Sequence, residues 1–205
     1  MDGYVRSDVL KDLYDYDNSE FVNNLEMEGF FVAQQSHSNY AKTILSVPST
    51  LNMDYVDTFA PGLDDSKFWW LMEPFIDHSE VRTLLKSQGY QTVSFSTNWS
   101  LTDMNSADIH LAAFPVELTD FEQYLLQTTP LRLSQPFLQD SASVFTSETQ
   151  RRTILHTLGA LDDFVSDPDP VFVFAHILLP HPPFVLDAEG KPVQSATDFS
   201  FKDGE

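Results

Sequence analysis

The sequence predicts an α/β fold with a mostly parallel sheet, because segments with helical and strand-like patterns alternate along its 205 residues. Residues 18–28 have a helical pattern, with Asn18 or Ser19 as the N-cap and Gly29 as the stop signal. The apolar residues 30–33 follow at once and have the pattern of a short buried strand. Parallel sheets place their ligand sites at the carboxyl ends of the strands, so residues just after a strand are candidates for function.

The same order of helix and strand recurs further along the chain. Residues 79–87 are predicted to form a helix, and residues 90–95 a strand rich in β-forming side chains. A capping box at 147–150 begins another predicted helix, whose apolar side carries Ile154, Leu155, Leu158, Leu161 and Phe164. This repetition favours an α/β fold over one in which helices and strands are segregated.

The composition excludes several classes of function. Lys and Arg number 11 against 31 Asp and Glu, a net charge of −20, which opposes binding to nucleic acid or to anionic lipid head groups. No cysteine is present, so the chain has no disulfide, thiolate zinc site or cysteine nucleophile. No apolar run reaches the roughly 18 residues expected of a membrane span, and no signal peptide is recognisable at the start. Hydrophobic residues make up 42% of the chain, which is enough for a folded core.

The chemistry is expected between residues 38 and 53, where a polar entry leads into Thr43 and then into an apolar, helix-like run. Backbone N–H groups at a helix start are unpaired and carry a partial positive charge, so a phosphate or sulfate group binds there readily. The Thr43 hydroxyl would lie beside that anion, and it becomes a good nucleophile when a metal ion holds it as the alkoxide. The alternative is a threonine that only caps the helix.

Several short blocks resemble known proteins. Residues 43–49, Thr-Ile-Leu-Ser-Val-Pro-Ser, resemble the nucleophile segment of lipid phosphoethanolamine transferases, in which a threonine is followed by two residues and then by Ser-(Val/Leu)-Pro. Asp-Gly-Tyr at 2–4, Asp-Asn-Ser at 17–19 and Ser-Asn-Tyr at 38–40 look like segments of bacterial sulfatase-like membrane proteins. Both groups of proteins belong to the alkaline phosphatase superfamily.

The resemblance implies a three-layer α/β/α fold of the alkaline phosphatase type, with a mostly parallel sheet. It implies a single sulfatase-like domain over residues 1–205, truncated at both ends, with an insertion at 102–139. Asp2 matches an acidic metal ligand, and its alternative is a polar chain terminus without a role. By the same likeness Thr43 is both the nucleophile and a metal contact, and Asn39 binds substrate.

Two histidines follow the third predicted strand, residues 171–175. His176 comes directly after the strand, and His181 lies between two prolines that stiffen its backbone, which suits a positioned imidazole. The alternative for His181 is a loop histidine bonded to a carbonyl. The phosphoethanolamine transferases have a similar histidine pair that ends in His-x-Pro. By that likeness His181 is a catalytic residue at the substrate phosphate or at a second zinc, and His176 contacts the substrate.

The resemblance implies a metal-dependent hydrolase or transferase that acts on phosphate or sulfate esters of a small molecule or a lipid head group. The cofactor would be a divalent metal, zinc in the first place, with manganese or calcium as alternatives. The family is membrane-anchored and lies at the extracytoplasmic face of the bacterial inner membrane. It completes its metal site with a downstream Asp-His pair, and no histidine follows His181 in this chain. We therefore expect an incomplete site, and the alternative is a non-catalytic extracytoplasmic binding or structural domain that keeps the fold.

Ser46 offers a second candidate nucleophile. Residues 46–49, Ser-Val-Pro-Ser, resemble the Cys/Ser-x-Pro-Ser core of true sulfatases, in which the first residue is converted to formylglycine. Thr50 stands where those enzymes require arginine, which favours Thr43 over Ser46.

Overall fold

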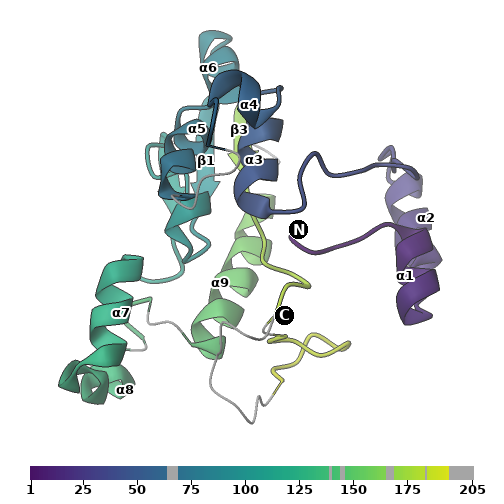
Figure 1. The fold of residues 1–205 in the computed structure, drawn as a ribbon. Helices are drawn as coiled ribbons and strands as arrows, with labels where there is room; N and C mark the ends of the chain where they lie inside the picture. The colour runs from purple at the N-terminus through teal and green to yellow at the C-terminus, as the bar shows by residue number, and fades with distance from the viewer. Residues whose placement is uncertain (64–68, 139, 144–145, 165–168, 183, 194–205) are drawn as a thin grey trace.

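The computed structural model describes residues 1–63, 69–138, 140–143, 146–164, 169–182 and 184–193. Within these residues a three-stranded sheet forms from β1 (Gln91–Phe95), β2 (Ile109–Leu111) and β3 (Val171–Phe174). The strands lie in the order β2-β1-β3, and both neighbouring pairs are parallel (Figure 1). The predicted α/β class with a parallel sheet is confirmed.

Helices surround the sheet and extend away from it. They are α1 (Ser7–Tyr14), α2 (Ser19–Met27), α3 (Thr43–Leu51), α4 (Val56–Phe59), α5 (Glu73–Asp77), α6 (Glu80–Ser87), α7 (Asp120–Thr128), α8 (Gln135–Leu138) and α9 (Ser147–Ala160), with short 3₁₀ helices η1 (Trp69–Met72), η2 (Ser100–Thr102), η3 (Pro130–Ser134) and η4 (Leu161–Phe164). Figure 1 shows α1 and α2 standing to one side of the sheet as one arm, and α7 and α8 forming a second arm. The predicted helices at 18–28 and 79–87 are confirmed as α2 and α6.

Helices contact both faces of the sheet. On one face, Ile76 of α5 is fully buried and belongs to the same apolar cluster as Phe172 and Phe174 of β3 and the last residue of α3. On the other face, the ring of Phe95 on β1 meets His156 of α9 edge-on, with 6.4 Å between the ring centroids. Burial of these large side chains on both faces supplies most of the driving force for holding three short strands together.

Helix α9 differs from its prediction in both cap and face. Thr146 is the N-cap and accepts the backbone N–H of Thr149 at 3.1 Å, so the predicted capping box at 147–150 is wrong. Of the residues predicted on the apolar side, Leu155 and Leu158 are 41% and 46% exposed, whereas Ile154 is buried and Leu161 packs against the same apolar cluster. The buried residues of α9 are Thr149, Thr153, Ile154 and Thr157. Small hydroxyl side chains suit this face because it borders a small cavity beside His176.

The strand predicted at residues 30–33 is not formed, and this prediction is wrong. Phe30 and Phe31 are 63% and 93% exposed, and the sheet of the described residues contains only β1, β2 and β3. In Figure 1 these residues belong to the connection that leads from α2 back to α3, away from the sheet. An apolar run becomes a buried strand only where a sheet edge lies beside it, and no local pattern specifies that neighbour.

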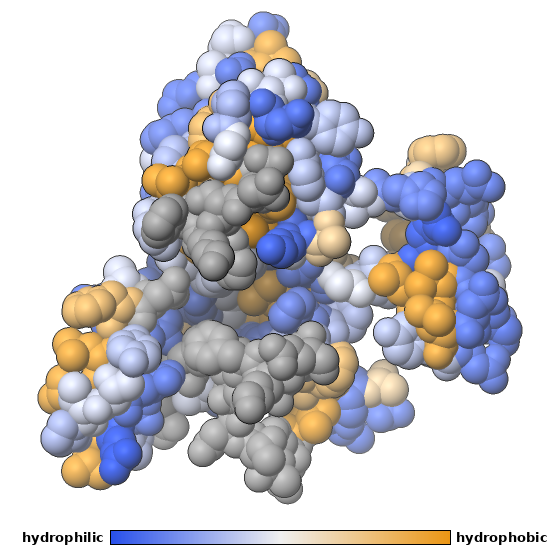
Figure 2. Space-filling model, viewed as in Figure 1, coloured by the Kyte–Doolittle hydropathy of each residue, from blue (hydrophilic) through white to orange (hydrophobic). Residues whose placement is uncertain are grey.

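The strand β2 lies inside residues 102–139, the range predicted as an insertion. Because β2 pairs with β1, the first part of this range belongs to the central sheet. The later part forms α7, η3 and α8, with a small cluster of their own around Leu126 and Ala142. Figure 2 shows apolar side chains gathered on both arms; those with high exposure are Leu13, Tyr14, Met27, Phe121, Leu133 and Phe137.

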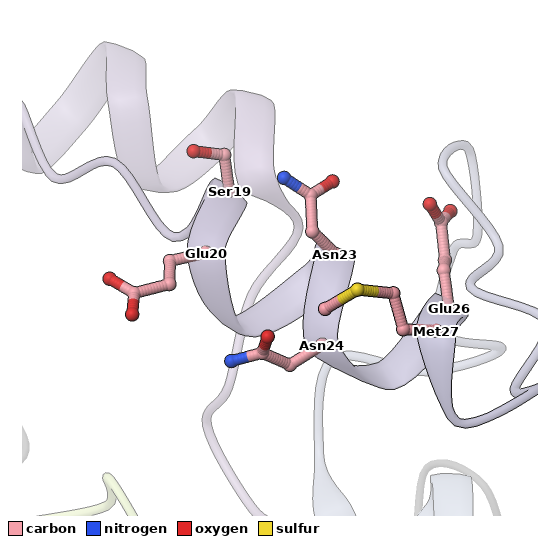
Figure 3. A pocket seen from close by; sticks show the side chains of 6 residues that line it. All are labelled: Ser19, Glu20, Asn23, Asn24, Glu26 and Met27. Carbon is pink, nitrogen blue, oxygen red and sulfur yellow. The ribbon is translucent and has the colours of Figure 1, made fainter.

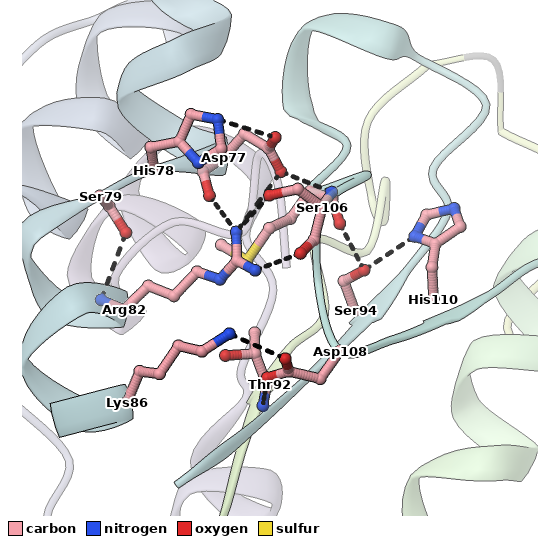
Figure 4. A network of polar contacts seen from close by, with 11 residues as sticks. Asp77, His78, Ser79, Arg82, Lys86, Thr92, Ser94, Ser106, Asp108 and His110 are labelled. Atoms are coloured by element: carbon pink, nitrogen blue, oxygen red, sulfur yellow. Dashed lines mark hydrogen bonds and ion pairs between the residues drawn. The ribbon is translucent and has the colours of Figure 1, made fainter. Parts of the chain in front are cut away.

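A polar network ties α6 and the segment before β2 to the sheet (Figure 4). Buried Arg82 of α6 donates to the backbone carbonyls of Asp77 and Ser106. The carboxylate of Asp108 accepts the backbone N–H of Thr92 on β1 at 2.9 Å. Each of these polar groups finds a partner, which allows a charged side chain to be buried at moderate cost.

His110 on β2 makes a polar contact at each of its two ring nitrogens. Ser94 has a single hydroxyl proton and donates it to the carbonyl of Met104 at 2.8 Å, so it must accept a hydrogen bond from His110 Nδ1, also at 2.8 Å. The other ring nitrogen, Nε2, donates to Glu117 at 3.0 Å. The hydrogen bond to Glu117 raises the pKa of His110 in spite of its partial burial. Serine, histidine and a carboxylate also occur together in hydrolases, but Ser94 is 0% exposed and donates elsewhere, so this array is structural.

We predict that His110 stabilises the fold more at acid than at alkaline pH. A folded-state pKa above the ordinary value of 6.5 gives stability that is fully present below that value and is lost as pH rises through the folded pKa. The variant His110→Gln should therefore lower the free energy of unfolding more at about pH 6 than at about pH 9, measured by urea denaturation. Equal losses at the two pH values would contradict a raised pKa of His110 in the folded chain.

We predict that Ile76→Ala lowers the free energy of unfolding by about 2–5 kcal/mol, because it leaves a cavity between α5 and the sheet. The matched control is Leu133→Ala, since Leu133 is 74% exposed and its truncation should change stability by no more than about 0.5 kcal/mol. Urea denaturation measures both variants. Similar small effects for the two would argue against the packing of α5 described above.

Candidate functional site

The first residues of the chain lie against the segment that follows β3. The backbone N–H of Asp2 donates to the carbonyl of Ile177 at 2.8 Å. Gly3 lies beside His181, since a Cβ at this position would make an ordinary contact of 3.7 Å with the His181 backbone, and its φ of +78° favours glycine. Figure 1 accordingly shows the N-terminus close to the beginning of α3.

Thr43 is the first residue of α3, and its hydroxyl points at Asp2. Thr43 Oγ1 donates to both carboxylate oxygens of Asp2 and lies 3.2 Å from each. Among the described residues no side chain caps this helix, so its first backbone N–H groups place their partial positive charge at the same point. A hydroxyl and a carboxylate that are 41 residues apart in sequence thus meet at a helix start.

His176 approaches Asp2 from the end of β3. Its Nε2 lies 3.5 Å from Asp2 Oδ2, and the two side chains are 8% and 16% exposed. Its Nδ1 lies 3.1 Å from Oγ1 of Thr102, a fully buried threonine at the end of η2. The imidazole therefore bridges Asp2 and the loop that follows β1.

These contacts keep the carboxyl group of Asp2 ionised. Burial raises its pKa, but the hydrogen bond and charge of His176 lower it, and the charge of His181 and the hydrogen bond from Thr43 lower it further. The resulting pKa lies below the ordinary value of 3.8. A carboxylate rather than a carboxylic acid therefore accepts the Thr43 hydrogen bond at neutral pH.

His181 lies at the exposed rim of this group. Its Nδ1 is 2.6 Å from the carbonyl of Pro182, which is the kind of contact expected of a loop histidine bonded to a carbonyl. Its charge also lowers the pKa of Asp2, so the imidazole lies within electrostatic reach of the carboxylate. An exposed ring in that position is accessible to a ligand bound at Asp2 and Thr43.

Four of the five predicted site residues form one group, which we call the Asp2 cluster: Asp2, Thr43, His176 and His181. Asn39 makes a different contact, because its side-chain amide donates to Oγ of Ser49 at 2.8 Å and so holds the preceding loop on α3. The alternative nucleophile Ser46 lies 2.8 Å from Oγ of Ser38, whereas Thr43 supplies the hydroxyl that donates to Asp2.

The donors of the Asp2 cluster are of the kinds that bind divalent cations. Carboxylate and imidazole are ordinary zinc ligands, and zinc takes about four ligands in proteins. Within the described residues, no three His, Cys, Asp or Glu side chains are arranged to hold a metal ion. Asp2 and Thr43 could supply two adjacent oxygen ligands, which is part of a metal site and not a complete one.

Thr102 is the member of the site that sequence reasoning did not identify. It lies in a short 3₁₀ helix 74 residues before His176, and nothing in the residues around it signals a role. Only the parallel pairing of β1 with β3 brings the loop after β1 beside the residue after β3. The role of Thr102 therefore follows from the way the strands pair, and no local sequence pattern indicates it.

A hollow along α2 is the other surface feature with polar side chains (Figure 3). It is lined by Ser19, Glu20, Asn23, Asn24, Glu26 and Met27. All of these side chains come from one helix and fan out around it, so they do not converge on a common point.

No family model, no curated protein and no solved structure matches the chain. Among the described residues, no helix combines the length and the apolar character that crossing a membrane requires. Function is therefore inferred from the geometry of the Asp2 cluster together with the short blocks of sequence.

We predict that Asn39→Ala lowers the free energy of unfolding by about 1 kcal/mol, because it removes the hydrogen bond to Ser49. Ser49 keeps a partner, since its hydroxyl donates to the carbonyl of Asp54 at 2.6 Å. Urea denaturation measures the loss. An unchanged stability together with weaker ligand binding would instead support the substrate-binding role expected of Asn39 from sequence.

Proposed function

We propose that the chain is a phosphate-ester hydrolase or transferase domain in which Thr43 is the nucleophile. The observation that supports this most directly is the hydrogen bond from Thr43 to the ionised Asp2 at the start of α3. A hydroxyl, a proton acceptor and a partial positive charge meet there, which are the components that transfer of an anionic group needs. The resemblance of residues 43–49 to a transferase nucleophile segment supports the same residue.

The proposed first step is attack by Thr43 Oγ1 on phosphorus. As the new O–P bond forms and the bond from phosphorus to the ester oxygen breaks, the Thr43 proton passes through Asp2, which already accepts that hydrogen bond, to the leaving oxygen. Backbone N–H groups at the start of α3 stabilise the negative charge on the phosphoryl oxygens. His181 at the rim contacts a phosphoryl oxygen or the leaving oxygen. Water or an acceptor hydroxyl then takes the phosphoryl group from Thr43 and restores its hydroxyl.

A divalent cation belongs to this proposal, zinc in the first place and manganese or calcium as alternatives. Asp2 and Thr43 would hold it, and the low pKa of Asp2 means that protons do not compete for the carboxylate at neutral pH. When bound, the cation supplies positive charge that lowers the pKa of the threonine hydroxyl and balances the developing negative charge.

The proposed substrate is a phosphate ester of a small molecule or a lipid head group, with a sulfate ester as the second choice. A location at the extracytoplasmic face of a bacterial inner membrane, as in the family that the sequence blocks resemble, is part of the same proposal. The competing proposal is a non-catalytic extracytoplasmic binding or structural domain, and the two experiments that follow separate the proposals.

We predict that calorimetric titration with zinc finds about one site per chain, and that Asp2→Asn weakens the affinity by about tenfold or more. The control is Asp8→Asn, the same chemical change at an exposed carboxylate that pairs with Arg6. It should leave the affinity unchanged. Equal effects of the two variants would show that zinc binds to the acidic surface in general and not at Asp2.

We predict that incubation with a chromogenic phosphodiester leaves a phosphoryl group on Thr43, because that oxygen forms the bond to phosphorus. Intact-mass measurement and peptide mapping locate the group, and Thr43→Ala should abolish it. A modified Ser46, or formylglycine at that position, would reject Thr43 as the nucleophile. Absence of both zinc binding and turnover would favour the non-catalytic domain.

A further inference from the structure

The loop between β1 and β2 places a buried hydroxyl behind His176. Thr102 is 0% exposed, and its Oγ1 lies 3.1 Å from His176 Nδ1. The same oxygen lies 3.1 Å from Oγ1 of Thr97 and 3.3 Å from the carbonyl of Trp99. One hydroxyl proton therefore has three neighbours that could accept it, and the other contacts decide which of them does.

Thr97 does not require the Thr102 proton. Its hydroxyl donates to Oδ1 of Asp103 at 2.7 Å and already accepts the backbone N–H of Trp99 at 3.1 Å. The Trp99 carbonyl is the most distant of the three neighbours. Thr102 is therefore able to donate to His176, provided that His176 Nδ1 carries a lone pair.

The opposite side of the ring determines the tautomer of His176. Its Nε2 faces Oδ2 of the ionised Asp2 at 3.5 Å. A carboxylate repels a nitrogen lone pair and attracts an N–H, so the contact with Asp2 favours the tautomer with its proton on Nε2. Its Nδ1 then presents the lone pair to Thr102, and the Thr102 hydroxyl donates to it.

We propose that Thr102 is a positioning residue that fixes the orientation of the His176 ring by donating to Nδ1, so that the His176 Nε2–H holds the Asp2 carboxylate beside Thr43. His176 then supports Asp2, whereas its sequence position suggested contact with the substrate. The consequence for catalysis rests on the proposed function, but the hydrogen bonds themselves require neither metal nor substrate. Hydrogen bonds that orient a metal-binding group typically change metal affinity or activity by about 10- to 100-fold.

The test is NMR detection of the His176 ring nitrogens in the metal-free chain at about pH 9, with His176→Gln to assign the signals. The wild type should show the Nε2–H tautomer with Nδ1 accepting a hydrogen bond. Thr102→Ser, which keeps the hydroxyl, should show the same. Thr102→Val keeps the shape without the donor, so its Nδ1 signal should move toward that of an unbonded nitrogen.

The matched control is Thr157→Val. Thr157 is also buried and lines the same small cavity as His176, but its hydroxyl donates to the carbonyl of Thr153 within its own helix at 3.0 Å. The control should leave the His176 signals unchanged. Zinc affinity and phosphodiester turnover should fall about tenfold in Thr102→Val and recover in Thr102→Ser.

An Nδ1–H tautomer in the wild type, or His176 signals that are the same in Thr102→Val, would overturn the proposal. The wild-type Nδ1 signal, which shows whether that nitrogen accepts a hydrogen bond, tests the proposal even if Thr102→Val does not fold. A wild-type chain that shows the expected tautomer but neither binds zinc nor turns over a phosphodiester would reject the proposed function while supporting the positioning of His176 by Thr102.

Discussion

The backbone hydrogen bond from Asp2 to Ile177 is the contact on which the site depends. Without this bond Asp2 would be one more solvated carboxylate on a chain with 31 acidic residues. The bond fixes the first residues beside the end of β3. The carboxylate then lies between the Thr43 hydroxyl and the His176 ring, where partial burial and positive neighbours define its charge.

The parallel sheet positions His176 and Thr102 in the site. Since β1 and β3 run in the same direction, the residues that leave them emerge at the same edge, and Thr102 can contact His176 although the two are far apart in sequence. Helix α3 is packed beside them through a buried cluster around Ile44, Leu45 and Val56. Packing of that kind fixes the direction of the helix, and so it fixes where the Thr43 hydroxyl points.

Patterns of neighbouring residues in the sequence predicted the helix and the strand that carry Thr43 and His176. The start of a helix at Thr43 and a strand that ends just before His176 follow from polar-to-apolar transitions, and both are confirmed. That Asp2 lies close to Thr43 and His176 was implied only by the resemblance to the alkaline phosphatase superfamily. The strand predicted at 30–33 is wrong because an apolar pattern does not say whether a sheet edge is adjacent.

Other features of the fold and of the site have no recognisable pattern in the sequence. The three residues of β2 are too few to show a period, and their place in the sheet depends on the polar network around Arg82 and on His110. Thr102 resembles any loop threonine until the sheet pairing is known. The buried face of α9 carries three threonines beside Ile154, although apolar residues are usual on an inward face, and it borders a small cavity beside His176.

The most direct test of the central claim is a double-mutant cycle between Asp2→Asn and Thr43→Val, followed by urea denaturation in metal-free buffer. The two residues are in contact, so the double variant should lose less stability than the sum of the single variants, by about 1 kcal/mol. Losses that add to within about 0.3 kcal/mol would contradict the claim that Asp2 and Thr43 form one site.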